Sequence, residues 1–135
     1  MEQKNFMSWG EFEEFTRDIL ENFDFLVEFR KVFEFRGRKY EIDVVGHRKD
    51  LILCLDCKLY KKGKSRVSAL KRQARIHYER TKALEKLEGK RCIPIVVTFL
   101  DDSLLFEENC IFVPVEKLND FLNNLDFYLE ELNVL

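Results

Sequence analysis

The segment Leu51–Tyr60 restricts the possible folds of this chain most, because its pattern indicates a strand with one complete apolar face. Alternate side chains of a strand lie on the same face of a sheet. One face here is wholly apolar and consists of Leu51, Leu53, Leu55, Cys57 and Leu59. The other face carries Ile52, Cys54, Asp56, Lys58 and Tyr60. The segment therefore predicts a strand that packs on a core with one face and presents two charged side chains on the other.

The rest of the chain provides further strands and the helices that would cover a sheet. Ser8 followed by Glu11 is a capping-box pattern, which marks the start of a first helix. Arg36-Gly37-Arg38 is typical of a hairpin turn, since Gly adopts positive φ without strain. In chain order we expect a helix over 9–23, strands over 25–35, 39–47 and 51–60, a long helix over 66–87, strands over 92–100 and 111–115, and one or two closing helices.

This order, αβββαββα, predicts an α/β fold with a central mixed β-sheet flanked by helices, in a single domain over residues 1–135. The 13 Phe and the 46% of hydrophobic residues suffice for a core. No apolar run approaches the roughly 20 residues of a spanning helix. The N-terminus lacks a signal-peptide pattern, so we expect a cytoplasmic protein without membrane association.

Cys54 and Cys57 form a C-x-x-C pair, which raises the question of a zinc site. Cys92 and Cys110 do not have the spacing of a second ligand pair. Residues three apart on a strand point to opposite faces. We therefore interpret the four cysteines as reduced residues that pack as small apolar side chains.

Charge is distributed unevenly along the chain although the total is only −2. Residues 58–91 contain 13 Lys and Arg but 3 Asp and Glu, whereas residues 92–135 contain 1 Lys and 9 Asp and Glu. A polyanion such as nucleic acid could bind the basic segment while the acidic remainder keeps the protein in solution. The alternative is a solvated, charged helix that pairs with acidic neighbours.

Asp43, Asp56 and Lys58 form the constellation that could support chemistry. A tight turn joins the strands 39–47 and 51–60, so the two carboxylates and the lysine can converge. Asp43 and Asp56 offer the oxygen ligands that Mg²⁺ or Mn²⁺ takes, with the backbone carbonyl of Cys57 as a further ligand. Lys58 can position a water or neutralise the transition state. The alternative is a same-strand ion pair between Asp56 and Lys58 that contributes little.

A family resemblance rests on these residues. Glu41-Ile-Asp-Val-Val-Gly followed by Leu-Cys-Leu-Asp-Cys-Lys resembles the D…(D/E)-x-K signature of restriction-endonuclease-like nucleases. Gly10-Glu-Phe-Glu-Glu-Phe with Ile19-Leu20 resembles the first helix of Mrr-type restriction nucleases and archaeal Holliday-junction resolvases. The sequence departs from the family in Ile42, where many members have Pro, and in Asp56, where Glu is commoner.

The resemblance implies several further site residues. In those families the first helix adds a glutamate to the metal site, which selects Glu13; a solvated glutamate near a helix start is the alternative. In some relatives a glutamine on the helix after the lysine reaches the active site, which suggests Gln73, and a surface glutamine is the alternative. Independently of the resemblance, the basic loop and helix that directly follow Lys58 supply the residues expected to bind nucleic acid. These are Lys61, Lys62, Lys64, Arg66, Lys71, Arg72 and Arg75, together with Gln73.

The resulting hypothesis is a Mg²⁺- or Mn²⁺-dependent endonuclease that hydrolyses DNA phosphodiester bonds, with structured or junction DNA as one candidate substrate. The sequence leaves RNA and a homodimer open. One alternative is a non-catalytic nucleic-acid-binding or assembly module that retains the fold. Another is a structural interaction protein, which would leave the basic segment unexplained.

Overall fold

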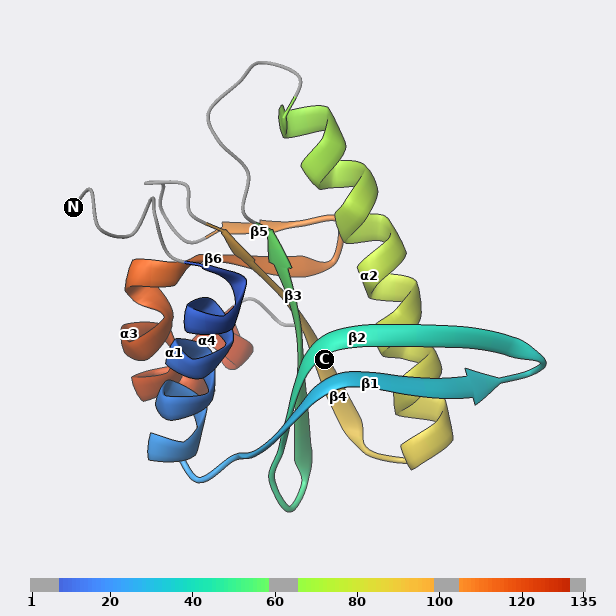
Figure 1. The fold of residues 1–135 in the computed structure, drawn as a ribbon, viewed down its shortest axis with the longest axis horizontal. Helices are drawn as coiled ribbons and strands as arrows, with labels where there is room; N and C mark the ends of the chain where they lie inside the picture. Colours follow the sequence, from blue (N-terminus) through green and yellow to red (C-terminus); the bar gives the residue numbers. More distant parts are fainter. Residues whose placement is uncertain (1–7, 59–65, 99–104, 132–135) are drawn as a thin grey trace.

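A computed structural model describes residues 8–58, 66–98 and 105–131 of the chain (Figure 1). Its centre is a six-stranded mixed sheet with the strand order β1-β2-β3-β4-β6-β5. The elements in chain order are α1 (Trp9–Asn22), β1 (Leu26–Phe35), β2 (Arg38–His47), β3 (Leu51–Lys58), α2 (Arg66–Glu88), β4 (Arg91–Thr98), β5 (Leu105–Glu107), β6 (Cys110–Pro114), the 3-10 turn η2 (Val115–Lys117), α3 (Leu118–Asn123) and α4 (Leu125–Glu131).

The α/β class and the expected order of helices and strands are confirmed. β1, β2 and β3 pair antiparallel, whereas β3 pairs parallel with β4 and β4 parallel with β6. The parallel pair β3–β4 requires a crossover connection, which α2 provides. Helix α2 therefore lies across one face of the sheet, and α1, α3 and α4 gather on the other side (Figure 1).

The two faces of β3 lie in different cores, as the sequence predicts. Leu53, Leu55 and Cys57 pack with α1, α3 and α4, whereas Ile52 and Cys54 pack with Ala83 and Leu84 of α2. Cys54 and Cys57 thus point to opposite faces, and all four cysteines are free thiols. Strand β3 is buried on both faces, with seven of its eight residues buried.

One end of each long helix matches its sequence signal. Ser8 caps α1 with a complete capping box: its hydroxyl accepts from the Glu11 amide at 3.1 Å, and its own amide donates to the Glu11 carboxylate at 2.8 Å. Helix α2 ends at Glu88, and Gly89 follows with a φ of +70°. The face of α2 that packs on the sheet is buried and includes Leu70, Ala74, His77, Thr81 and Leu84.

One short strand differs from the expected pattern. The edge strand β5 pairs antiparallel with β6 through a turn at Glu108 and Asn109, both with positive φ. Such a turn is usually marked in sequence by Gly or Asn-Gly. Glu108-Asn109 carries no glycine, so the hairpin signal was missing.

No helix within the three described stretches is long and apolar enough to cross a membrane.

Candidate active site

Strands β2 and β3 separate at Asp43, and this separation creates the candidate site. Their ladder pairs Val44–His47 with Ile52–Leu55 and ends there. Beyond it, Ile42 packs in the α2-side core whereas Val44 packs in the opposite core, so β2 turns about its own axis at Asp43. The side chain of Asp43 then replaces the missing backbone partner: its Oδ2 accepts from the amide of Cys57 at 3.1 Å.

The carbonyl of Cys57 faces the same gap as its amide. The N–H and C=O of one strand residue point to the same neighbouring strand. Because the Cys57 amide points at Asp43 of β2, its carbonyl also points to the side where β2 has left the ladder. The thiol of Cys57 lies in the opposite core, and burial raises its pKa well above the ordinary value. Cys57 therefore presents its backbone carbonyl, and not its thiol, to the candidate site.

The carboxyl groups of Asp43 and Asp56 lie next to each other. Burial raises the pKa of Asp43, and the Asp56 carboxyl raises it further through a side-chain hydrogen bond and charge repulsion. The Cys57 amide and the charge of Lys58 lower the pKa of Asp43, yet the balance remains upward. Two carboxylates from neighbouring strands are therefore held closer together than their charges favour.

Asp56 is buried, with 2% of its surface exposed, and two cations approach it. Lys58 Nζ lies 3.2 Å from Asp56 Oδ2, and Arg80 lies 3.7 Å from the same oxygen. Within the described parts of the chain this oxygen nevertheless has no hydrogen-bond partner. The two cations offset the charge of this buried oxygen, and it retains the capacity to accept a hydrogen bond or to bind a cation.

Helix α2 places three polar side chains over this end of the sheet. Gln73 Oε1 accepts from Lys58 Nζ at 3.4 Å, so Gln73 lies beside the predicted catalytic lysine. His77, one turn later, donates from Nε2 to the carbonyl of Cys54 at 2.8 Å. Arg80 donates to the carbonyl of Glu41 at 2.9 Å besides its approach to Asp56. Arg80 was not among the predicted residues, although its spacing of seven from Gln73 places it on the same helix face.

The buried His77 should lower the free energy of unfolding in mild acid. Its side chain is fully buried, and burial lowers its pKa from 6.5 to about 4, with Arg80 and Lys58 adding to the effect. Below pH 6.5 the unfolded chain binds a proton that the folded chain does not, so the free energy of unfolding falls with pH until about pH 4. Between pH 7 and pH 5 we expect a loss of about 2 kcal/mol from this group, measurable by urea unfolding.

The variant His77→Gln should lose most of this pH dependence. His47→Gln is the matched control, because His47 is partly exposed and pairs with Glu28 on the surface. An equal pH dependence in wild type and His77→Gln would contradict the prediction.

Glu13 lies outside the contacts that join Asp43, Asp56 and Lys58. Its carboxylate is held by the guanidinium of Arg30 through two hydrogen bonds of 2.8 and 3.2 Å. Helix α1 packs on the face of the sheet opposite α2, whereas Asp56 and Lys58 point toward α2. Over residues 8–58, 66–98 and 105–131, no three His, Cys, Asp or Glu side chains form a group that could hold a metal ion. A metal-ligand role for Glu13 stays a prediction.

The residues expected to bind nucleic acid are placed only in part. Lys61, Lys62 and Lys64 lie outside the described residues, as does the side chain of Arg66. Lys71 pairs with Glu107 at 3.7 Å, and Arg75 pairs with Glu108 at 3.3 Å. Arg72 is exposed. The acidic β5–β6 turn thus partly neutralises the basic first half of α2.

A relative with known sequence covers nearly the whole chain. An uncharacterized protein from Archaeoglobus fulgidus is 47% identical over 129 residues, which are 96% of this chain and 100% of the relative. The chain belongs to the same family as this archaeal protein. No family model matches the chain.

Two crystal structures resemble the fold at low similarity. The protein of unknown function AF1548 has a TM-score of 0.49 and 22% identity over 64% of this chain and 45% of its own. The protein VC1899 from Vibrio cholerae has a TM-score of 0.45 and 12% identity over 89% of this chain and 32% of its own. The chain thus spans less than half the length of either solved chain, and these two likenesses support no functional argument.

Proposed function

We propose that this protein is a metal-dependent nuclease that hydrolyses DNA phosphodiester bonds. The observation that carries the proposal is the pair of adjacent carboxyl groups of Asp43 and Asp56, one of them with a raised pKa and the other buried with an oxygen lacking a hydrogen bond. Lys58 stands beside them. A divalent cation would offset the repulsion between the two carboxylates. It would also coordinate the Asp56 oxygen that lacks a hydrogen bond.

The donor set suits Mg²⁺ or Mn²⁺. Asp43, Asp56 and the carbonyl of Cys57 would hold the ion through oxygens, and hard oxygen ligands are what these cations take. Two carboxylates and a carbonyl leave coordination positions for water and for a substrate phosphate. When bound, the ion acidifies a water and stabilises charge on the phosphoryl group.

The chain's own groups supply orientation and charge. The Lys58 ammonium lies at the C-terminal end of β3, with 19% of its side chain exposed, and can contact an entering phosphate or hold the attacking water. Gln73 restrains that ammonium through the 3.4 Å hydrogen bond. Arg80 supplies a second positive charge on the α2 side of Asp56, 19% exposed. The roles of Lys58 and Gln73 are those that the resemblance to restriction-endonuclease-like nucleases implies, and structured or junction DNA is one candidate substrate.

Two subsidiary proposals accompany this one. The four free cysteines fit a reducing compartment, which supports a cytoplasmic location. RNA is a second candidate substrate, because contacts to phosphate alone do not distinguish RNA from DNA.

A specific observation also favours the non-catalytic alternative. Lys58 and Arg80 both approach Asp56 Oδ2, so two cations already offset its charge without a metal. In that case the cluster would be structural, and the fold would serve as a nucleic-acid-binding module. The two functions differ in one measurable property, which is the affinity of the cluster for a divalent cation.

Metal binding and cleavage test the proposal together. The wild-type protein is melted with increasing Mg²⁺ or Mn²⁺, and we expect a rise in Tm that Asp43→Asn abolishes. At a metal concentration of 100 times Kd the stabilisation is about 2.7 kcal/mol. Asp50→Asn, an exposed aspartate in the β2–β3 turn, is the matched control and should keep the rise.

The same preparations are incubated with duplex, single-stranded, flap and four-way-junction DNA and with RNA, in Mg²⁺ and in EDTA. Cleavage in Mg²⁺ by wild type and the control, but not by Asp43→Asn, is the expected result. Wild-type protein that binds DNA but shows neither metal stabilisation nor cleavage would establish the binding module instead.

A further inference from the structure

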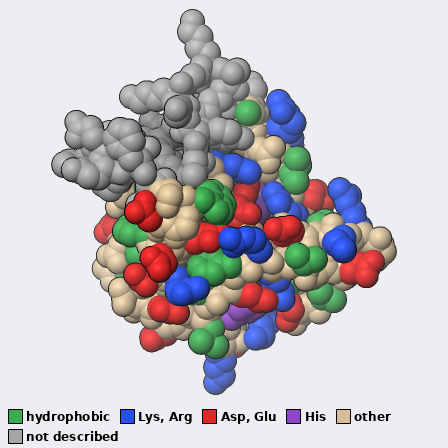
Figure 2. All heavy atoms as spheres, in the orientation of Figure 1, with side chains coloured by type: hydrophobic (Ala, Val, Ile, Leu, Met, Phe, Trp, Pro, Cys, Tyr) green, Lys and Arg blue, Asp and Glu red, His purple; other side chains and the backbone are tan. Residues whose placement is uncertain are grey.

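The outer part of the β1–β2 hairpin forms a groove with α2. Beyond the β2–β3 ladder, the hairpin extends over α2 as an arm (Figure 1). Two adjoining hollows of about 280 and 230 Å³ lie between the arm and the helix and share Arg38, Tyr40 and Glu79. We call these two hollows the hairpin groove. Figure 2 shows Lys and Arg side chains over this end of the molecule, with acidic side chains among them.

The hairpin groove is rich in positive charge. Two carboxylates line it, Glu41 and Glu79. The cations that line it are Arg36, Arg38, Lys39, Arg80, Lys82 and Lys86. Positive charge in a concave surface attracts polyanions and concentrates them locally.

Most of these cations are available to a ligand. In the parts of the chain that the structure describes, no carboxylate lies within salt-bridge distance of Arg36, Arg38, Lys39 or Lys86. The guanidinium groups of Arg36 and Arg38 lie over the rings of Phe35 and Tyr40, at 5.0 and 5.4 Å from the centroids. Such stacking holds a guanidinium in place while its N–H groups remain free to bind.

The groove adjoins the candidate active site. Arg80 lines the larger hollow and also approaches Asp56 Oδ2 at 3.7 Å. Glu41, on the same wall, precedes Asp43 by two residues and accepts from Arg80 through its carbonyl. A nucleic-acid strand with one phosphate at Asp43 and Asp56 could therefore continue into the hairpin groove.

The other side of the site is a weaker candidate for this contact. Lys71 and Arg75, in the first half of α2, already pair with Glu107 and Glu108. Binding a polyanion there would require breaking those pairs, whereas the hairpin cations need no such exchange.

We infer that the hairpin groove binds the sugar-phosphate backbone of the nucleic acid on one side of the position that is cut. The inference rests on the proposed function and extends it to a backbone-binding arm, built from the hairpin tip and the second half of α2. Phosphate contacts of this kind position the substrate without reading its sequence.

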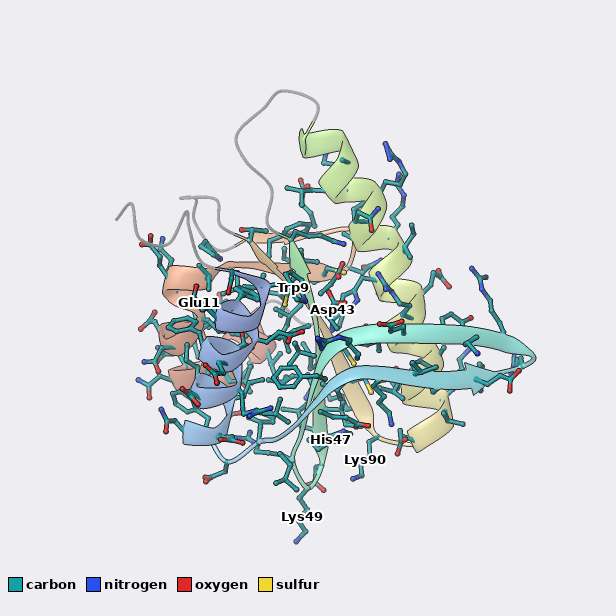
Figure 3. All side chains as sticks on the ribbon, viewed as in Figure 1. Trp9, Glu11, Asp43, His47, Lys49 and Lys90 are labelled. Carbon is teal, nitrogen blue, oxygen red and sulfur yellow. The ribbon has the colours of Figure 1, made fainter. Side chains whose placement is uncertain are left out.

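The test measures the affinity for a fluorescein-labelled 24-base-pair duplex by anisotropy, in EDTA and over a range of KCl. The variant Arg36→Asn/Arg38→Gln removes two cations from the tip. It preserves the turn, because residues 36 and 37 both have positive φ and Asn-Gly suits such a turn. The control Lys49→Gln/Lys117→Gln makes the same change in net charge at two exposed positions outside the groove (Lys49 is labelled in Figure 3).

We expect the tip variant to bind about tenfold more weakly and its log–log salt slope to fall by about 2, since each lost phosphate contact lowers the slope by about 1. The control should match wild type. A gain-of-affinity variant tests the same surface independently. Glu79→Gln should bind several-fold more tightly, whereas Glu88→Gln, an exposed position at the end of α2, should not.

Each outcome bears on one proposal or on both. Equal binding by the tip variant and wild type, or equal losses in the tip variant and the control, would overturn the groove even if the protein cuts DNA. Equal competition by polyglutamate would show a general polyanion surface and would also overturn it. Binding that depends on the groove cations, without metal-dependent cleavage, would support the groove proposal and overturn the nuclease proposal. A protein that neither binds nor cuts would overturn both.

Discussion

Replacement of Lys58 by Met should lower the rate of metal-dependent DNA cleavage by about 10²–10³-fold without unfolding the protein, which is the typical loss for one positioned transition-state contact. Met has nearly the length of Lys but no charge. Lys58 is the last residue of β3, and its ammonium contacts the polar groups of Asp56 and Gln73, so its replacement leaves the apolar core intact. The rate is measured under single-turnover conditions with the duplex or junction that wild type cuts best.

The same variant distinguishes the role of Lys58 from that of the proposed metal ligands. Removing a positive charge next to Asp43 and Asp56 should leave metal binding unchanged or make it tighter, whereas Asp43→Asn should lose it. Lys49→Met, in the turn at the far end of β2 from Asp43, is the matched control (Figure 3). A Lys58→Met protein that cuts as fast as wild type would remove Lys58 from the mechanism.

Replacement of Leu55 by Ala should lower the free energy of unfolding by about 2–5 kcal/mol, the range for a buried Leu that leaves a cavity. Leu55 is fully buried in the core that β3 shares with α1, α3 and α4. It also directly precedes Asp56, so strand β3 holds both the core and the candidate site. For a domain with a typical total stability of 5–15 kcal/mol, this loss is large.

Urea unfolding of Leu55→Ala and Leu26→Ala provides the comparison. Leu26 is 77% exposed at the start of β1, so its truncation should change stability by less than about 0.5 kcal/mol. A change of that small size in Leu55→Ala would contradict the placement of β3 at the centre of the fold.

The elements of this fold were predictable where local signals and burial agree. The alternation from Leu51 to Lys58 assigned every described side chain of β3 to the correct face. The capping box at Ser8 and the glycine at position 89 fixed helix ends. From two strands joined by a tight turn, the convergence of Asp43, Asp56 and Lys58 followed by geometry alone.

The parts that were missed depend on contacts between distant segments. Arg80 reaches Asp56 and Glu41 across a gap that exists only because β2 leaves β3. Arg30 has a φ of +49° within a strand and captures Glu13 from α1, which no periodicity could indicate. A sum of charges over residues 58–91 likewise could not show that acidic residues near β6 pair with part of that segment.

Because β2 separates from β3 at Asp43, the hairpin arm can become longer or shorter without changing the pairing of β2 with β3. Outward of Asp43, β2 pairs with β1 alone among the described strands, and the side chain of Asp43 lies at the base of the arm. Inserting or deleting one residue in each strand would shift the tip by about 3.3 Å, and doing so twice would restore the original facing of every side chain. If the arm binds nucleic-acid backbone as proposed, paired insertions of this kind would change the length of bound backbone in steps of about 7 Å without moving Asp43 or Asp56.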